Sequence, residues 1–328
     1  MPRALRHVVG WRSLEEFILA LEQRGELLRV SHPVDVELEA GCIADLLVKR
    51  NGPAVIFDQP RLGDGSISRY PLAMNLFGTR DRTNLALGVV EPKEIGEMMT
   101  GLMKPDIGGI LRRPWTGLGL LRQGISMAPR KVSRGNCQQV RMDNPDVTRL
   151  PIPTSWPQDG GPFMTLPLVV TSDPETGVHN LGMYRSQVFG PDEVGLHWQK
   201  HKHGADHAEA SEDRMPVAIC LGGPPQVIFS AISPLPDNLS EYEFAGLLSG
   251  RRLKITKCLT NDLWVPADCD FVIEGYTLPS ERRMEGPFGD HFGHYSLEDE
   301  YPVMHVTAIT HRKDPTVPMT IVGIPPME

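Results

Sequence analysis

The spacing of apolar residues changes character about a third of the way along the chain. Up to residue 103, apolar residues recur at helical spacing in three stretches, and short apolar runs lie between them. Ser13 to Glu16 form a capping box, so a helix is expected to start there and to end at Gly25. Further helices are expected over residues 36–49 and 92–102, strands over 27–30, 54–57 and 72–76, and a strand or loop over 84–90. This pattern predicts a small mixed α/β domain over residues 1–103.

Beyond this domain, residues 104–124 are rich in Gly, Pro and Arg, which is typical of a linker or arm. The apolar runs that follow are short and bounded by turn residues, which favours strands. Strands are expected over 166–171, 178–188, 217–221, 226–232, 254–256, 271–275, 301–312 and 320–323, and helices over 192–207 and 240–248. The sequence therefore predicts an α+β protein whose second domain, residues 125–315, is a split β-barrel of the flavin reductase-like kind.

Composition narrows the class of protein. The chain has 328 residues, of which 40% are hydrophobic and 23% charged, as in soluble globular proteins. A formal net charge of −8 argues against a nucleic-acid partner. No apolar run approaches the roughly 18 residues of a transmembrane helix, and no signal core is present, so a cytoplasmic protein is expected. The five cysteines form no paired motif, which favours reduced thiols and gives no catalytic cysteine.

Two carboxylates stand five residues apart in the run Glu285-Gly286-Pro287-Phe288-Gly289-Asp290. A strand would put them on opposite faces, and a helix would separate them by about 140°. The insert of Gly, Pro and Phe predicts instead a tight bend that brings both acids to one cavity. Paired carboxylates in such a site can divide their pKa values, so that one donates a proton at neutral pH. A surface turn with two flanking acids is the alternative.

Arg185 follows the strand Asn180-Leu181-Gly182-Met183-Tyr184. Strict alternation would put Arg185 on the same face as Leu181 and Met183. An arginine on a barrel strand must reach solvent, an acid or an anion, so Arg185 is either a surface residue or part of an anion site.

Three further features are candidates for ligand binding. His197 and His201 are four residues apart, but Trp198 stands where a zinc protease has glutamate, so a zinc hydrolase is excluded while a metal-binding histidine is not. Glu241 opens a helix after Ser240, either as a favourable first-turn acid or as an oxygen ligand for a divalent cation. Residues 222–225 and 230–234 expose backbone N–H groups that can bind a phosphate.

Taken in order, these segments resemble the UbiD family of decarboxylases, which use prenylated FMN. The matching segments are residues 159–163, 180–185, 222–225, 240–246, 260–263, 274–275 and 285–290. The resemblance implies reversible, non-oxidative decarboxylation of an aromatic or α,β-unsaturated carboxylic acid through a covalent adduct with the cofactor. Arg185 is expected to orient the carboxylate, and Glu285 and Asp290 to handle the proton, with Asp290 as the expected donor.

The same resemblance implies how the cofactor is held. A divalent metal, usually Mn²⁺, is expected on Asn180, Glu241 and a histidine, which is His197 or, as the alternative, His201; the family also leaves room for K⁺. The residues expected to contact the cofactor are Asn180, Met183, Tyr184, Arg185, His197, Trp198, Ser230, Ser233, Pro234 and Glu241.

Family members are longer than this chain. The resemblance therefore implies that residues 316–328 begin a C-terminal region, absent here, that supplies a lysine to the cofactor phosphate and most dimer contacts in a homo-oligomer. A flavin prenyltransferase is the expected cofactor supplier. A flavin-dependent oxidoreductase and a non-catalytic flavin-binding or assembly subunit are the competing functions, and the substrate and the direction of the reaction stay open.

Overall fold

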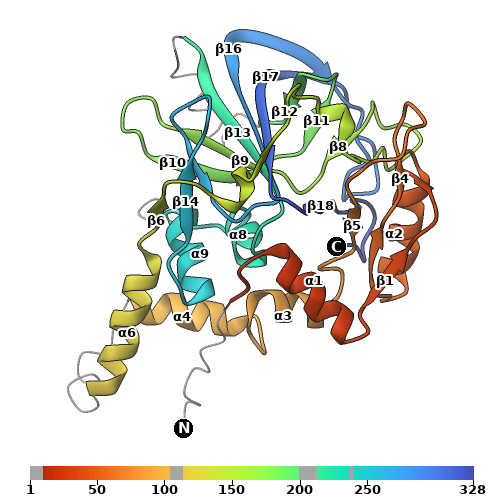
Figure 1. Ribbon diagram of the computed structural model, residues 1–328. Coiled ribbons are helices and arrows are strands. Elements are labelled where there is room, and N and C mark those ends of the chain that lie inside the picture. The colour runs from red at the N-terminus through yellow and green to blue at the C-terminus, as the bar shows by residue number, and fades with distance from the viewer. Residues whose placement is uncertain (1–9, 104–113, 199–210, 212, 237–238) are drawn as a thin grey trace.

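The structure is a computed structural model that describes residues 10–103, 114–198, 211, 213–236 and 239–328 (Figure 1). Its largest element is a sheet of nine strands among these residues, in the order β10-β9-β13-β16-β17-β12-β11-β8, with β7 paired to β17. The strand pairs of this sheet are antiparallel throughout the described residues, and Figure 1 shows that the sheet curls into an open half-barrel. The expected α+β fold with a split barrel is thereby confirmed. The strands are β7 (Val140–Arg141), β8 (Phe163–Met164), β9 (Leu168–Ser172), β10 (His179–Met183), β11 (Ser186–Val188), β12 (Glu193–Leu196), β13 (Met215–Leu221), β16 (Phe271–Glu285) and β17 (Asp299–His311).

Three smaller sheets flank the half-barrel. A mixed sheet has the order β1-β3-β5-β18, and its last strand comes from the far end of the chain. The expected strands over residues 27–30, 54–57 and 72–76 are confirmed in it, although the last ends at Met74. The strands of the smaller sheets are β1 (Leu27–Val30), β2 (Val34–Asp35), β3 (Ala54–Phe57), β4 (Pro60–Arg61), β5 (Leu72–Met74), β6 (Arg130–Val132), β14 (Lys254–Lys257), β15 (Trp264–Pro266) and β18 (Val317–Pro318).

Helices gather below the half-barrel in Figure 1 and on the outer side of the small mixed sheet. Ser13 accepts a hydrogen bond from the N–H of Glu16 and starts α1, as its sequence predicts. Ser240 and Glu243 form a complete capping box at α9. The helices are α1 (Leu14–Gln23), α2 (Glu39–Lys49), α3 (Arg80–Leu87), α4 (Lys93–Met103), α6 (Pro114–Met127), α8 (Pro225–Ser230) and α9 (Glu241–Ser249), with single 3₁₀ turns at Asn136–Gln138 and Val147–Arg149.

Several sequence expectations about helices and strands were wrong. Residues 84–90 belong largely to α3, which Thr79 caps and left-handed Gly88 ends. Residues 226–230 belong to α8 instead of a strand, because Pro225 occupies the first helical position, and residues 231–232 form the turn after it. Helix α6 begins at Pro114, inside the expected linker over 104–124, and the assignment of that segment as a linker stays a prediction. Residues 193–196 pair with β11 and β17 as β12, so the expected helix over 192–207 is wrong where it is described.

The expected strand over residues 178–188 is interrupted at Tyr184 and Arg185, which separate β10 from β11. The two strands pair with different partners, β10 with β9 and β11 with β8 and β12. Residues 320–323 are irregular, since the strand near this end is β18 at 317–318.

Buried apolar side chains run continuously between the small sheet and the half-barrel. One core cluster joins Phe57 and Met74 to Ile273 and Met304. The carboxylate of Glu328 accepts hydrogen bonds from Asn75 N (3.0 Å) and Phe77 N (2.8 Å), which ties the last residue to the small sheet. No helix in the described part of the chain is long and apolar enough to cross a bilayer. The expected domain boundaries stay a prediction.

Candidate active site

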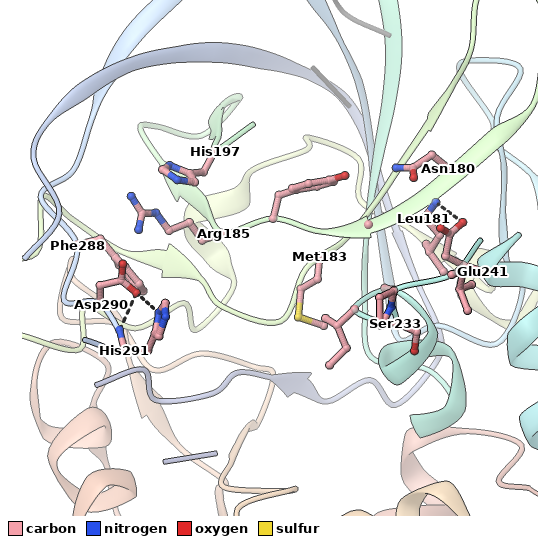
Figure 2. A pocket seen from close by; sticks show the side chains of 16 residues that line it. Asn180, Leu181, Met183, Arg185, His197, Ser233, Glu241, Phe288, Asp290 and His291 are labelled. Atoms are coloured by element: carbon pink, nitrogen blue, oxygen red, sulfur yellow. Dashed lines mark hydrogen bonds and ion pairs between the residues drawn. The ribbon is translucent and has the colours of Figure 1, made fainter. Parts of the chain in front are cut away.

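A cavity of about 610 Å³ opens at the point where β10 gives way to β11 (Figure 2). Its size lies in the range of small-molecule and cofactor sites. The lining comes from five separate parts of the chain, namely β10 with the two residues after it, the residue after β12, the turn after α8, the start of α9 and the loop after β16. The lining residues are 180–185, His197, 231–235, Glu241, Phe288, Asp290 and His291.

A buried ion pair lies at one end of this cavity. The Nε of Arg185 donates to Oε1 of Glu285 over 3.0 Å, and the two side chains are 14% and 0% exposed. Its Nη2 donates to the hydroxyl of Ser296 over 3.1 Å. The guanidinium also lies over the ring of Phe288, 4.6 Å from its centre. These three contacts fix Arg185 at the cavity wall as a cation that can hold a carboxylate.

His197 shares Glu285 with Arg185. Its Nδ1 lies 2.8 Å from the same Oε1, while Oε2 of Glu285 is buried without a hydrogen-bond partner in the described structure. The ring of His197 packs on Tyr301 at 4.3 Å between centres. Burial, followed by the charge of Glu285, raises the pKa of the Tyr301 hydroxyl, so the ring stays neutral beside the ion pair.

Asp290 lies at the same end of the cavity, next to Phe288 in Figure 2. Its Oδ1 accepts from the N–H of His291 over 2.6 Å and is paired with Nδ1 of the same residue. The side chain is 31% exposed, in contrast to that of Glu285. The two acids of the bend therefore have different environments, one fully buried against a cation and one at the cavity surface.

The other end of the cavity contains Asn180 and Glu241 (Figure 2). Asn180 is 7% exposed, and its side-chain Nδ2 is buried without a hydrogen-bond partner in the described structure. Glu241 begins α9 and accepts a hydrogen bond from Leu181 N over 3.3 Å. An unsatisfied buried amide is costly. Its presence beside an acid indicates a site built for a further polar ligand.

Most of the residues predicted for the site line the cavity, but some do not. Glu285 reaches it only through Arg185 and His197. Ser230 is fully buried and donates within α8 to Gln226 O over 2.6 Å, and Trp198 is 4% exposed outside the lining. His201 lies outside the described residues.

The structure does not bring His197 to Asn180 and Glu241, because it lies at the opposite end with Arg185 (Figure 2). His197 directly follows strand β12, so the expected helix is wrong at His197. No cluster of three His, Cys, Asp or Glu side chains suited to a metal is present among the described residues.

Three residues at the ionic end were missed by sequence reasoning. Phe288 was noted only as part of the bend, yet it is 4% exposed and supports Arg185. His291 and Ser296 were not singled out. The sequence could have indicated His291, because a histidine that directly follows an acid such as Asp290 can pair with it. No feature of the neighbouring sequence indicated Ser296.

Comparisons with known proteins agree with this arrangement. A family model described as the 3-octaprenyl-4-hydroxybenzoate carboxy-lyase Rift-related domain matches residues 130–325, and the N-terminal domain of the same family matches residues 18–100. A protein from Archaeoglobus fulgidus is 43% identical over 324 residues, covering 98% of this chain and 66% of that protein.

Solved structures are similar in fold. The UbiD-class enzyme HmfF from Pelotomaculum thermopropionicum, in an evolved dimeric form in complex with prFMN, is 27% identical with a TM-score of 0.82, covering 96% of this chain and 68% of that one. Vanillic acid decarboxylase from Sedimentibacter hydroxybenzoicus, in its closed form, is 30% identical with a TM-score of 0.83, covering 96% and 65%. The chain thus spans about two thirds of the length of these relatives. With both domain models matched in order and the fold shared, this chain belongs to the UbiD family of 3-octaprenyl-4-hydroxybenzoate carboxy-lyases.

Proposed function

We propose that this protein is a prenylated-FMN-dependent carboxy-lyase that reversibly and non-oxidatively decarboxylates an aromatic or α,β-unsaturated carboxylic acid. The observation that carries this proposal is the buried Arg185–Glu285 pair in a cavity that Asp290 also lines. A cation and a separate acid at one end of a cavity suit a reaction that removes CO₂ and delivers a proton. Family membership and the prFMN or FMN complexes of HmfF support the cofactor.

The chemistry sets what the residues must do. When the carbon–carbon bond to the carboxylate breaks, CO₂ leaves and the electron pair stays on the substrate carbon. The bound prenylated flavin supplies an electron-poor ring system to receive that charge. Arg185 orients the carboxylate through its guanidinium, and Glu285 keeps Arg185 at the wall. Asp290 donates the proton that forms the new carbon–hydrogen bond.

The opposite end of the cavity suits the phosphate side of the cofactor. Asn180 offers a buried amide and Glu241 a carboxylate, both oxygen donors of the kind that Mn²⁺ and other hard divalent cations prefer. These two residues would hold such a cation, which neutralises phosphate charge. His197 is not proposed as a third ligand, because it is engaged with Glu285, and no described residue is proposed for K⁺.

The proposal is tested on the 328-residue chain co-expressed with a flavin prenyltransferase. Native mass spectrometry reads whether prenylated FMN is retained and in which oligomer. Release of CO₂ is then measured with benzoic, hydroxybenzoic, furoic and cinnamic acids. Chain that retains the cofactor but releases CO₂ from none of these acids, or that oxidises NAD(P)H instead, would contradict the proposal.

Asp290→Asn is the sharpest variant for the donor role. It removes the transferable proton while keeping the size of the side chain, so we expect retained cofactor and a loss of turnover of at least about 100-fold. Asp143→Asn, an exposed acid outside the cavity, is the matched control and should leave turnover unchanged. Normal turnover in Asp290→Asn would assign proton donation to another group.

A further inference from the structure

Two loops that carry the same Gly-Pro-Phe triplet pack against each other beside the site. Residues 161–163 lead into β8, and residues 286–288 lie between Glu285 and Asp290. Gly160 N donates to Pro287 O over 2.8 Å. A Cβ on Gly160 would lie 1.9 Å from the carbonyl oxygen of Gly286, so only glycine permits this approach. The rings of Phe163 and Phe288 are 4.8 Å apart, which places Phe163 behind the ring that supports Arg185.

Asp159 connects the two loops through its carboxylate. Oδ1 accepts from Gly289 N over 2.8 Å, and Oδ2 accepts from Trp156 N over 2.9 Å and Ser155 N over 3.2 Å. The N–H of Gly289 belongs to the residue directly before Asp290. Burial raises the pKa of Asp159, although these three N–H groups and the charge of Arg185 act in the opposite direction. One half-buried carboxylate therefore ties the residue before Asp290 to the backbone at residues 155 and 156.

Gln187 makes the second connection. It is 4% exposed on β11, where its Oε1 accepts from Gly286 N and its Nε2 donates to Gly160 O, both over 2.8 Å. One side chain therefore fixes both loops. Gly286 directly follows Glu285, so this bond lies next to the buried acid of the ion pair.

The N–H groups between the two acids are fully accounted for by these contacts. Gly286 N is bound by Gln187, Gly289 N by Asp159, and Phe288 N by the hydroxyl of Ser296 over 3.2 Å, while Pro287 has none. Backbone hydrogen bonds of an irregular loop to fixed side chains determine its position, because the loop has no ladder of its own. The spacing between Glu285 and Asp290 thus depends on two residues that line no part of the cavity.

We infer that Asp159 and Gln187 are positioning residues that set where Asp290 and Phe288 stand relative to Arg185. This inference rests on the proposed function and deepens it. According to this inference, the rate of proton delivery depends on the hydrogen bonds that Asp159 and Gln187 make to the bend. We call this pair of residues the brace. Cofactor binding at the Asn180 end does not depend on the brace. Misplacement of a catalytic group by about 1 Å can cost about 100-fold in rate.

The first test is Gln187→Met, which has a similar length but neither hydrogen bond. We expect faster hydrogen–deuterium exchange in peptides covering residues 284–291, a 10- to 100-fold lower kcat, and unchanged KM and flavin content. Gln138→Met is the matched control. Gln138 is also buried and bridges two segments, donating to Lys257 O (2.7 Å) and accepting from Gly135 N (3.2 Å), far along the chain from the bend. The control should lose stability without a fall in kcat or faster exchange at 284–291.

A second variant tests the close approach of the loops without removing any side chain. Gly160→Ala forces the Gly286 carbonyl away, whereas Gly190→Ala meets no atom within 4 Å and serves as its control. We expect Gly160→Ala to cause the same faster exchange at residues 284–291 and the same fall in kcat as Gln187→Met. We expect Gly190→Ala to cause neither.

Hydrogen–deuterium exchange is measured without turnover, so it tests the brace even if the chain releases no CO₂. The absence of CO₂ release would count against the proposed function only. Unchanged exchange at 284–291 in both Gln187→Met and Gly160→Ala would overturn the inference. An equal fall in kcat in Gln138→Met, or a raised KM with kcat unchanged, would overturn it as well.

Discussion

The two ends of the cavity are built in different ways. At the ionic end, Glu285 lies 100 positions from Arg185 and 88 from His197, and the charges of Arg185 and Glu285 are buried against each other. At the other end, Asn180 and Leu181 are adjacent on β10 and meet the first turn of α9, where Glu241 accepts a backbone hydrogen bond. Each end keeps one buried polar atom without a hydrogen-bond partner in the described structure, Oε2 of Glu285 and Nδ2 of Asn180, but the ionic end also holds a guanidinium paired with a buried carboxylate. This difference suggests that chemistry depends on the first end and cofactor retention on the second.

The largest expected effect comes from breaking the ion pair. Arg185→Met leaves Glu285 as a buried carboxylate without its guanidinium partner, which costs about 3–5 kcal/mol in the free energy of unfolding. It also removes the cation proposed to hold the substrate, so turnover should fall by at least about 1,000-fold. Urea unfolding and CO₂ release measure the two effects.

The double variant Arg185→Met with Glu285→Gln separates the two effects. It should recover most of the lost stability, because no unpaired charge is left, but none of the activity. If the double variant is as unstable as the single variant Arg185→Met, the charge left on Glu285 is not the cause of the instability of Arg185→Met.

A smaller and different effect is expected at the Asn180 end. Glu241→Gln removes a charged oxygen donor while keeping the helix start, so the chain should stay folded and retain about 10-fold less cofactor. Removal of divalent ions with a chelator should lower retention in the wild type but have little further effect in Glu241→Gln. Glu243→Gln, which preserves the capping box, is the control. Retention is measured as bound flavin per chain.

The same contrast explains what the sequence could and could not predict. The bend at residues 285–290 was predictable because Gly and Pro encode it locally, and the structure joins Arg185 to Glu285 and lines one cavity with Arg185 and Asp290. The break of the strand at Tyr184 was not predictable, because the strands with which β10 and β11 pair differ and this choice of partners is not encoded locally. Arg185 faces the cavity only because β10 and β11 join different neighbours there.

The surroundings of His197 illustrate a second limit. Spacing of four residues favours a shared helix face, yet residues 193–196 are taken up as a strand between β11 and β17. Tertiary pairing outweighed the local pattern. Likewise, Asp159 and Gln187 had no local signal for their role, since their partners lie 130 and 99 positions away.

A pH-dependent effect on stability alone concerns a buried acid that lies outside the cavity and, unlike Glu285, has no guanidinium within hydrogen-bond reach in the described structure. Asp270 accepts from Gly223 N (3.0 Å) and Thr316 N (3.1 Å), and burial raises its pKa to about 6. Because the folded chain then holds a proton that the unfolded chain has released, the free energy of unfolding should fall by about 2 kcal/mol as pH rises from 4 to 7. Asp270→Asn lacks this titration, so the stability advantage of the wild type over the variant should shrink across that range. Urea unfolding at successive pH values measures the difference. An advantage that grows with pH would mean that Arg312, whose charge favours the ionised form, outweighs burial at Asp270.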